Sequence, residues 1–396
     1  MLIHTLPKTE AEAAVIARVK QLTDFKWTPV RDVPTYTKEG GQTVLEAGVE
    51  VTGFPYSSPD RHDTFLTENI SFESFLTAIP NPYSKIYQFS HSGVNACYFG
   101  IVCNGLVRYA LGIQRRVPTA IWGTIPGMNK IIEAGEYKVD DLLLCDVLHA
   151  NGNGRNHVAI ITDILKNENG EIVEIEVSEA VRPSCRRATY STERFYEKYK
   201  LFALWRYEKL EEVPPLDKAA DRFLWESGAE KIAPKIAIDK GNRSNYIAGD
   251  DVQFAVSVEE TDTVEIYCDG EVVKSFPVTK RAIFPYAPKR GYYTARLKEA
   301  GDFVEFCVNE AELSAEVHDG IVTVKADPCD EKSRILYLDL REKGNKIGRI
   351  IEYHELTDEE KAKGVFSRPI PENCENFKVS FENEYGVWVH PMKSIF

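Results

Sequence analysis

Cys103 opens a short amphipathic run, "GIVCNGLVRYALGI", at residues 100–113. The apolar residues after the cysteine share one helical face and Gly112 is a natural stop, so Cys103 is expected in the first turn of a helix. There the helix dipole and the free amide groups favour a thiolate. Cys103 is therefore a candidate nucleophile, and the alternative is a core cysteine, since free cysteine is among the most buried residue types.

A thiolate nucleophile needs a base, together with a group that orients the base. In "NGNGRNHVAIITDI", residues 151–164, a loop of Gly and Asn runs into a predicted strand, and His157 stands at the first position of that strand. His149 precedes the loop and is the weaker candidate. His157 is thus the candidate base, although a capping or surface histidine would fit the same position.

Glu179 is the candidate orienting group. The strand that begins at His157 turns at "NENG", residues 167–170, and on the return strand Glu179 continues an apolar face. A hairpin loop with an odd number of residues brings Glu179 to the face of His157, whereas a two-residue Asn-Gly turn brings Ser178 there instead. Spacing leaves both registers open, and it also fits a solvated glutamate at a strand end.

The type of secondary structure that the sequence predicts around these residues changes along the chain. A helix is predicted over residues 9–22, capped by Thr9, and a strand-rich block over 141–206. The clearest boundary is the Pro-Pro pair in "LEEVPPLDK". Beyond it the apolar pattern has period two, and Asp-Gly pairs at 269–270 and 319–320 predict hairpins. Short strands with frequent turns indicate β-sandwiches.

Composition excludes several classes of protein. The chain has 396 residues, a net charge of −13 and eight cysteines without a CxxC pair. The acidic balance argues against sequence-independent nucleic-acid binding, and no apolar run is long enough to span a bilayer. A disulfide scaffold and a zinc ribbon are not expected. No metal site and no cofactor motif is visible, so we expect neither a metal nor a cofactor.

Three segments carry a resemblance to a known family. "VCNGLVRYALGI" resembles the nucleophile helix of the NlpC-type cell-wall cysteine peptidases, whose usual form is Asp-Cys-Ser-Gly-hydrophobic. "VDDLLLCDVLHA" followed by "NHVAIITDI" resembles their Gly-Asp-Leu strand and His-Val-Gly-Ile-Tyr element. "GFPYSS" at 53–58 resembles their Gly-x-Pro-Tyr element. The resemblance covers about residues 50–205.

The resemblance implies a role for each candidate residue. Cys103 attacks, His157 is the base, Glu179 orients the imidazole, and Tyr56 lies beside the thiolate. The sequence departs from the family where Val102 replaces the usual Asp and Asn104 the usual Ser, and where an insertion follows Tyr56. Because of these two substitutions, the sequence does not determine which bond is cleaved.

We therefore expect an α+β papain-like cysteine peptidase domain followed by all-β, Ig-like sandwich domains. The expected domains are a catalytic domain with an N-terminal helical extension at 1–212 and β-sandwiches at 213–314 and 315–396. The expected function is hydrolysis of an amide bond in peptidoglycan stem peptides, of the D-Glu/diamino-acid type, through a thioester. The alternatives are an acyltransferase or amidase on the same scaffold, or an inactive binding protein.

The expected partners are peptidoglycan fragments or a peptide substrate, with contact to the wall or to another protein through the β-sandwich domains. Neither nucleic acid nor membrane insertion is expected. The resemblance implies an extracellular or cell-envelope location. The N-terminus "MLIHTLPKTEAEAAVIARVK" lacks the features of a signal peptide, so a cytoplasmic location stays open.

Overall fold

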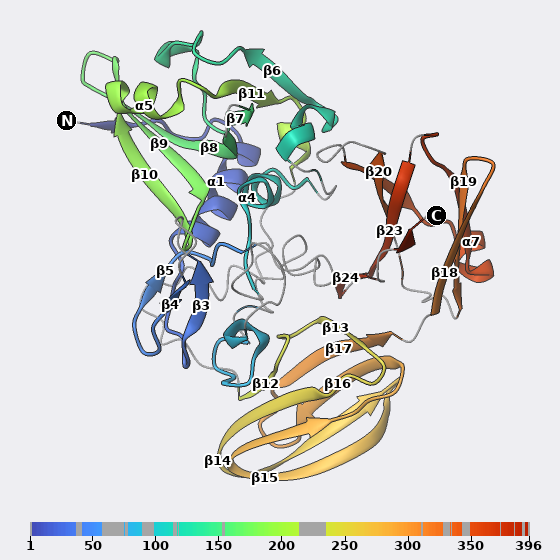
Figure 1. Cartoon of the computed structure of the whole chain (residues 1–396). Coiled ribbons are helices and arrows are strands. Elements are labelled where there is room, and N and C mark those ends of the chain that lie inside the picture. Colours follow the sequence, from blue (N-terminus) through green and yellow to red (C-terminus); the bar gives the residue numbers. More distant parts are fainter. Residues whose placement is uncertain are drawn as a thin grey trace.

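The structure of the chain is a computed structural model. It describes residues 2–36, 42–57, 75, 78–88, 99–113, 117, 119–152, 155–213, 235–309, 312–327, 333, 335–342, 349–372, 374–383, 385–389 and 393–394. These residues form three hydrophobic cores in chain order, and Figure 1 shows the strands and helices around each of them.

A seven-stranded antiparallel sheet is the centre of the first unit. Its order is β10-β9-β8-β7-β11-β6, and β1 pairs with the far end of β8. The strands are β1 (Ile3–His4), β6 (Met128–Ile132), β7 (Val147–Gly152), β8 (Arg155–Lys166), β9 (Ile172–Ala180), β10 (Cys185–Ser191) and β11 (Ala203–Tyr207). Two small ribbons, β2 (Lys26–Trp27) with β5 (Val51–Thr52) and β3 (Val33–Tyr36) with β4 (Gln42–Leu45), lie beside it.

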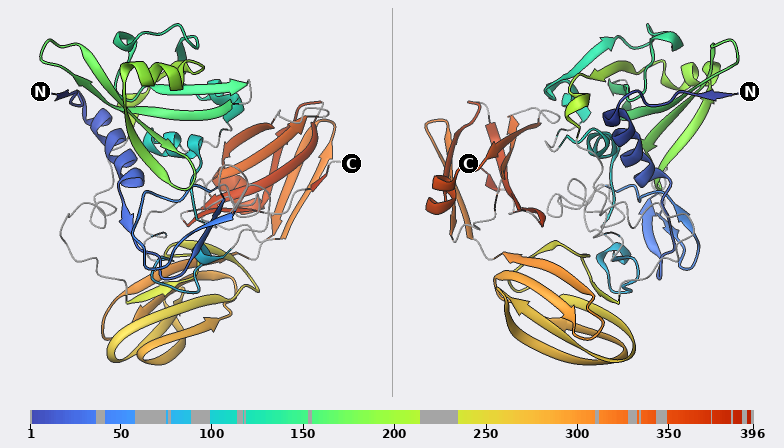
Figure 2. Two further views of the ribbon diagram at one scale, coloured as in Figure 1. Left: turned by 60° about the vertical axis from the view of Figure 1, so that its left-hand side comes forward. Right: turned by 180° about the vertical axis from the view of Figure 1, so that it is seen from behind.

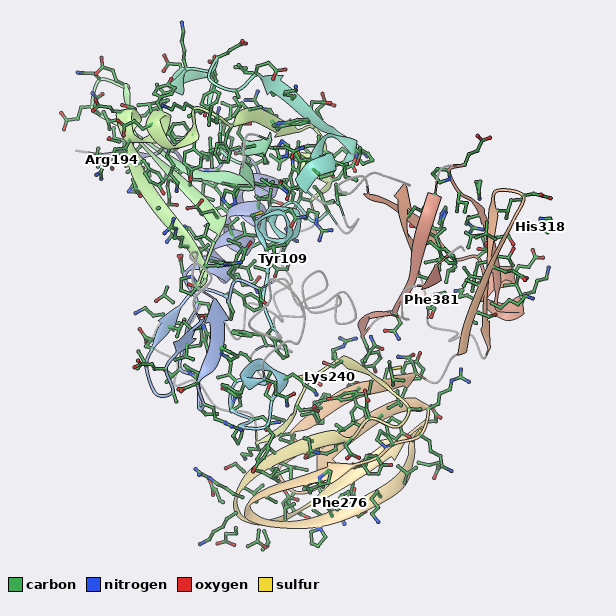
Figure 3. The ribbon with its side chains drawn as sticks, viewed as in Figure 1. Tyr109, Arg194, Lys240, Phe276, His318 and Phe381 are labelled. Atoms are coloured by element: carbon green, nitrogen blue, oxygen red, sulfur yellow. The ribbon has the colours of Figure 1, made fainter. Side chains whose placement is uncertain are left out.

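Two helices, α1 (Glu10–Thr23) and α4 (Cys103–Ala110), pack against each other and contact this sheet (Figure 2). The Thr9 hydroxyl caps α1 by accepting from the Glu12 amide at 3.1 Å, which confirms the predicted start of the helix. On α4 the apolar face is fully buried. Tyr109, labelled in Figure 3, donates its hydroxyl to Gln21 of α1 and ties the two helices together.

Within its described residues, the first unit has five further helices, one α-helix and four 3₁₀ helices. The α-helix α5 (Thr192–Tyr199) lies between β10 and β11, and the 3₁₀ helices η1 (Lys85–Tyr87) and η2 (Thr119–Thr124) lie on connections. Two more 3₁₀ turns, η3 (Val139–Asp141) and η4 (Leu210–Glu212), precede β7 and follow β11. All of these helices are short, so strands are the main regular structure around the core.

The predicted fold class, α+β and papain-like, is wrong. The described residues form twenty-five strands against four α-helices, so the chain is mostly β. Cys103 and His157 lie on a local unit of one helix and one hairpin. Strands dominate the rest of the described chain, so this local unit did not predict the fold class of the whole.

The second unit is a six-stranded sheet that encloses its own core. The order is β12-β14-β16-β17-β13, with β15 paired to β14. The strands are β12 (Ile236–Ile238), β13 (Ser244–Ile247), β14 (Val252–Cys268), β15 (Glu271–Tyr286), β16 (Gly291–Leu297) and β17 (Phe303–Asn309). Asp269 and Gly270 both have positive φ, of 50° and 86°, as a two-residue hairpin turn requires. The predicted hairpin is confirmed.

The third unit is a β-sandwich. One sheet has the order β18-β19-β22 and the other β21-β20-β23-β24, with β25 on β23, and buried residues of both sheets form one core. The elements are β18 (Glu312–His318), β19 (Ile321–Asp327), β20 (Ile335–Glu342), β21 (Arg349–Glu355), α7 (Asp358–Lys363), β22 (Val365–Pro369), β23 (Cys374–Asn383), β24 (Gly386–Val389) and β25 (Lys393–Ser394). The boundary drawn between 314 and 315 falls inside β18, so it lies a few residues too late.

Hydrogen bonds join the three units. The Ser84 hydroxyl and the Lys85 amide of the first unit both donate to the carbonyl of Asp239 at 2.9 Å. Asn245 and Asn383 join the second and third units by exchanging side-chain amide hydrogen bonds of 3.1 and 3.2 Å. Within the described residues, no helix is both long and apolar enough to cross a membrane.

Candidate active site

Cys103 is the first residue of α4 and is 6% exposed. The position matches the sequence prediction. Val102 is the N-cap and provides no side-chain hydrogen bond to the first turn. An aspartate at this place would accept from those amides and put a negative charge beside the sulfur. Valine leaves the positive end of the helix uncompensated, which favours a thiolate at Cys103.

The hairpin of β8 and β9 brings Glu179 to the face of His157. Five residues, 167–171, separate Lys166 from its partner Ile172. Two register shifts follow, and the second lies at Thr162 on β8. They cancel, so the odd-loop register holds where the site lies, and the imidazole Nε2 of His157 is 3.0 Å from Oε2 of Glu179. Ser178 points the other way.

Thr162 holds Ser178, the alternative to Glu179, on the opposite face of β9. Its hydroxyl is 2.9 Å from the hydroxyl of Ser178 and also donates to Glu176 at 2.9 Å. Ser178 is fully buried on that face. The five-residue loop, with two register shifts that cancel, thus gives the register that places Glu179 at His157.

Glu179 is a buried carboxylate with two cationic partners. It is 2% exposed, and its Oε1 accepts from Nη2 of Arg186 and from Nζ of Lys198, each at 2.8 Å. Its Oε2 is left for His157, with the hydroxyl of Tyr199 at 3.5 Å. Burial alone would raise the pKa of Glu179, but the hydrogen bonds with His157 and Lys198 outweigh it and hold that pKa well below the usual value. Glu179 is therefore ionised across the neutral range.

His157 links this carboxylate to the thiol. Because Nε2 faces Glu179, Nδ1 is the nitrogen left for Cys103. Burial would lower the pKa of His157, but hydrogen bonds with Cys103 and Glu179 raise it to about 9. Burial would likewise raise the pKa of the Cys103 thiol, but the hydrogen bond and charge of His157, the Val158 amide and the Thr119 hydroxyl lower it. Both shifts favour a thiolate beside an imidazolium over a neutral thiol beside a neutral imidazole.

Tyr56 lies beside the nucleophile, as the resemblance implied. It forms a parallel β-bridge with Ile101, two residues before Cys103, and its ring packs under the guanidinium of Arg182 at 5.9 Å. Burial, followed by the charge of Cys103, raises the pKa of Tyr56 to about 12. The phenol therefore keeps its proton and can donate a hydrogen bond near the sulfur. The structure brings all four predicted residues together.

His149, the weaker histidine candidate, has a different place. It lies on β7, stacked on Trp122 at 6.2 Å and edge-on to Trp205 at 5.6 Å, and its Nε2 is 2.8 Å from the carbonyl of Thr119. Burial lowers its pKa, so it is neutral at pH 7. No contact joins it to Cys103 among the described residues, and we assign it a structural role.

Sequence reasoning missed three residues of the site. Arg186 and Lys198 bind Glu179, and the hydroxyl of Thr119 lies 3.9 Å from Sγ of Cys103. Arg186 stands opposite Glu179 on β10, a pairing that a hairpin prediction for β9 and β10 could have found. Tertiary packing brings Lys198 and Thr119 to the site, so no local sequence pattern indicates them.

Cys103 is expected to be the fastest thiol to react in mildly acidic buffer. A short iodoacetamide pulse at a pH of about 6.5, where an ordinary thiol is about 1% ionised, should label Cys103 before the more exposed Cys268. Burial raises the pKa of Cys268, which makes it a matched control for access without activation. Peptide mapping provides the measurement. Equal labelling of both would mean that Cys103 is a packing residue.

Groups of three or more His, Cys, Asp or Glu side chains that could hold a metal ion are absent from the described part of the chain. The site itself brings together Cys103, His157, Glu179 and Tyr56. A thiolate, an imidazolium, a fixed carboxylate and a phenol are suited to acyl transfer through a thioester.

No family model matches the chain, and no curated protein matches it. Among solved structures, native alpha-2-macroglobulin from Escherichia coli spanning domains NIE-MG1 overlaps with a TM-score of 0.16 and 9% identity, over 40% of this chain and 96% of that chain. Its longer span, MG0-NIE-MG1, gives 0.19 and 8% over 67% and 95%. The FN1–FN3 domains of chicken CNTN1 give 0.19 and 8% over 68% and 96%. TM-scores this low carry no weight for the fold of the whole chain or for its activity.

Proposed function

We propose that the chain is a cysteine hydrolase that cleaves an amide bond through a thioester acyl-enzyme. One observation carries the proposal: a buried, doubly bound Glu179 holds His157 against Cys103 at the start of a helix. A cysteine that only packs does not need an ionised carboxylate and an imidazolium arranged in line with it. Burying charges costs free energy unless they are paired and hydrogen-bonded, and groups with pKa values perturbed in this way cluster at functional sites.

The reaction proceeds in two halves. The Cys103 thiolate attacks the carbonyl carbon, a carbon–sulfur bond forms, and the π electron pair moves to the carbonyl oxygen. The His157 imidazolium gives its proton to the leaving amine as the carbon–nitrogen bond breaks. The neutral imidazole then takes a proton from water, the hydroxide oxygen attacks the thioester, and the thiolate leaves. Glu179 stays ionised throughout and orients the ring.

The substrate that we propose is a stem peptide of peptidoglycan, cleaved between D-Glu and the diamino acid. The likeness of the segments around Tyr56, Cys103 and His157 to the NlpC-type peptidases supports it, and the changes at Val102 and Asn104 bear on the substrate side of the pocket. The β-domains would place the site on the wall or on another protein. A location in the cell envelope or outside the cell is part of this proposal.

Digestion of purified muropeptides with a mass readout tests the proposal. We expect new fragments that end in D-Glu and fragments that begin with the diamino acid, whose masses together exceed the mass of the intact muropeptide by one water. Products with a transferred acyl group would assign an acyltransferase instead. Intact muropeptides after incubation, with Cys103 shown to be reactive by alkylation, would reject this substrate class. Intact muropeptides with an unreactive Cys103 would leave only the binding protein.

A further inference from the structure

Val117 and the 3₁₀ helix η2 (Thr119–Thr124) form a wall beside the nucleophile, and side chains of two other elements hold this wall there. Its backbone carbonyls accept three hydrogen bonds from side chains of α4 and β7. These are Asn104 Nδ2 to Val117 O at 2.7 Å, His149 Nε2 to Thr119 O at 2.8 Å and Asn151 Nδ2 to Ala120 O at 3.1 Å. Three separate clamps on one short segment fix its position relative to α4.

Thr119 is the residue that this wall presents to Cys103. It is 8% exposed, and its Oγ1 lies 3.9 Å from Sγ, within the range of a hydrogen bond to sulfur. A threonine hydroxyl is both donor and acceptor, whereas a thiolate only accepts. With Cys103 ionised, the hydroxyl must therefore be the donor.

The same hydroxyl is placed to serve the next step. When Sγ bonds to a carbonyl carbon, negative charge moves from sulfur to the carbonyl oxygen, which is then two bonds from Sγ. A hydroxyl hydrogen turns freely about its C–O bond, so Thr119 can follow the charge without giving up its proton. Because η2 holds the Thr119 oxygen in place, its hydrogen bond to a developing oxyanion stabilises the transition state more than the ground state.

We propose that Thr119 is a further catalytic residue, whose hydroxyl donates first to the Cys103 thiolate and then to the oxyanion formed in acyl transfer. The proposal rests on the function proposed above. It also gives Asn104 a role: the amide that replaces the usual serine holds the carbonyl of Val117 and so keeps the Thr119 wall in register.

Two probes separate the two halves of the proposal. Iodoacetamide alkylates the sulfur by displacing iodide and forms no oxyanion, whereas p-nitrophenyl acetate acylates it and does. The variants are Thr119→Val, which keeps the shape and removes the hydroxyl, and Thr119→Ser, which restores the hydroxyl. The matched control is Thr124→Val, because Thr124 is exposed on the same 3₁₀ segment and its hydroxyl donates to Ile121.

For Thr119→Val we expect the midpoint of the alkylation rate against pH to rise by about 0.5–1 unit, the equivalent of one lost hydrogen bond to a charged sulfur. At a pH above both midpoints, acylation should still be slower by about 10- to 100-fold, as for the loss of one oxyanion donor. Thr119→Ser and Thr124→Val should have the same alkylation midpoint and the same acylation rate as the unmodified chain.

Three results would overturn the inference. Unchanged alkylation and acylation in Thr119→Val would remove both roles. An equal loss in the two reactions would remove the role at the oxyanion. A Thr119→Ser variant as slow as Thr119→Val would assign the effect to the methyl group. Slow alkylation of Cys103 in the unmodified chain, by contrast, would reject the proposed function itself and this inference with it.

Discussion

Replacing Cys103 with alanine is expected to abolish amide hydrolysis, and His157→Ala should lower kcat/KM by about 10⁴-fold or more. The thiolate forms the bond to the substrate, and the hydrogen bond and charge of His157 lower the pKa of the Cys103 thiol. The imidazolium supplies the proton to the leaving amine. Initial rates on the muropeptide that the unmodified chain cleaves fastest provide the measurement.

The double variant shows whether the two residues act as one unit. If they do, Cys103→Ala with His157→Ala should be no worse than Cys103→Ala alone, because a nucleophile without its base and a base without its nucleophile fail at the same step. Cys268→Ser is the control, since Cys268 is half-buried in the second unit and should leave the rates unchanged. Substantial hydrolysis by Cys103→Ala would contradict the mechanism.

Local rules predicted the parts of the site that are local. The helix that begins at Cys103, the Thr9 cap and the turn at Asp269-Gly270 follow from helical periodicity, capping chemistry and the need for positive φ. Each depends on residues within a few positions of one another. The sequence therefore placed the nucleophile at a helix start and the base on a strand.

The rest of the site depends on tertiary contacts, which the spacing of residues in the sequence does not indicate. The choice between Glu179 and Ser178 turns on two register shifts that cancel along β8 and β9, and one of them is held by Thr162. Thr119 reaches Cys103 because α4 holds Val117 and β7 holds η2 by hydrogen bonds. Likewise, a helix-and-hairpin unit is compatible with several architectures, so it predicted the site better than the fold class.

Glu179→Gln is expected to lower kcat/KM by about 10- to 100-fold and to narrow the pH profile from its alkaline side. Hydrolysis needs the thiolate together with the imidazolium. The profile of the unmodified chain should therefore be bell-shaped, with an alkaline limb set by the pKa of His157 at about 9. The negative charge of Glu179 is one cause of that raised value. Removing the charge lowers the pKa of His157, so the imidazolium loses its proton at a lower pH and the alkaline limb moves toward neutrality.

Two features make this result diagnostic of orientation and charge. Glutamine keeps the shape and an oxygen for His157, but it leaves Arg186 and Lys198 beside a neutral amide, which lowers the pKa of His157 further. Ser178→Ala is the matched control, because Ser178 is the neighbouring buried residue on the opposite face of β9. It should leave the alkaline limb in place. A silent Glu179→Gln with a severe Ser178→Ala would mean that the hairpin register is one residue away from the one described, and that the carboxylate does not touch the base.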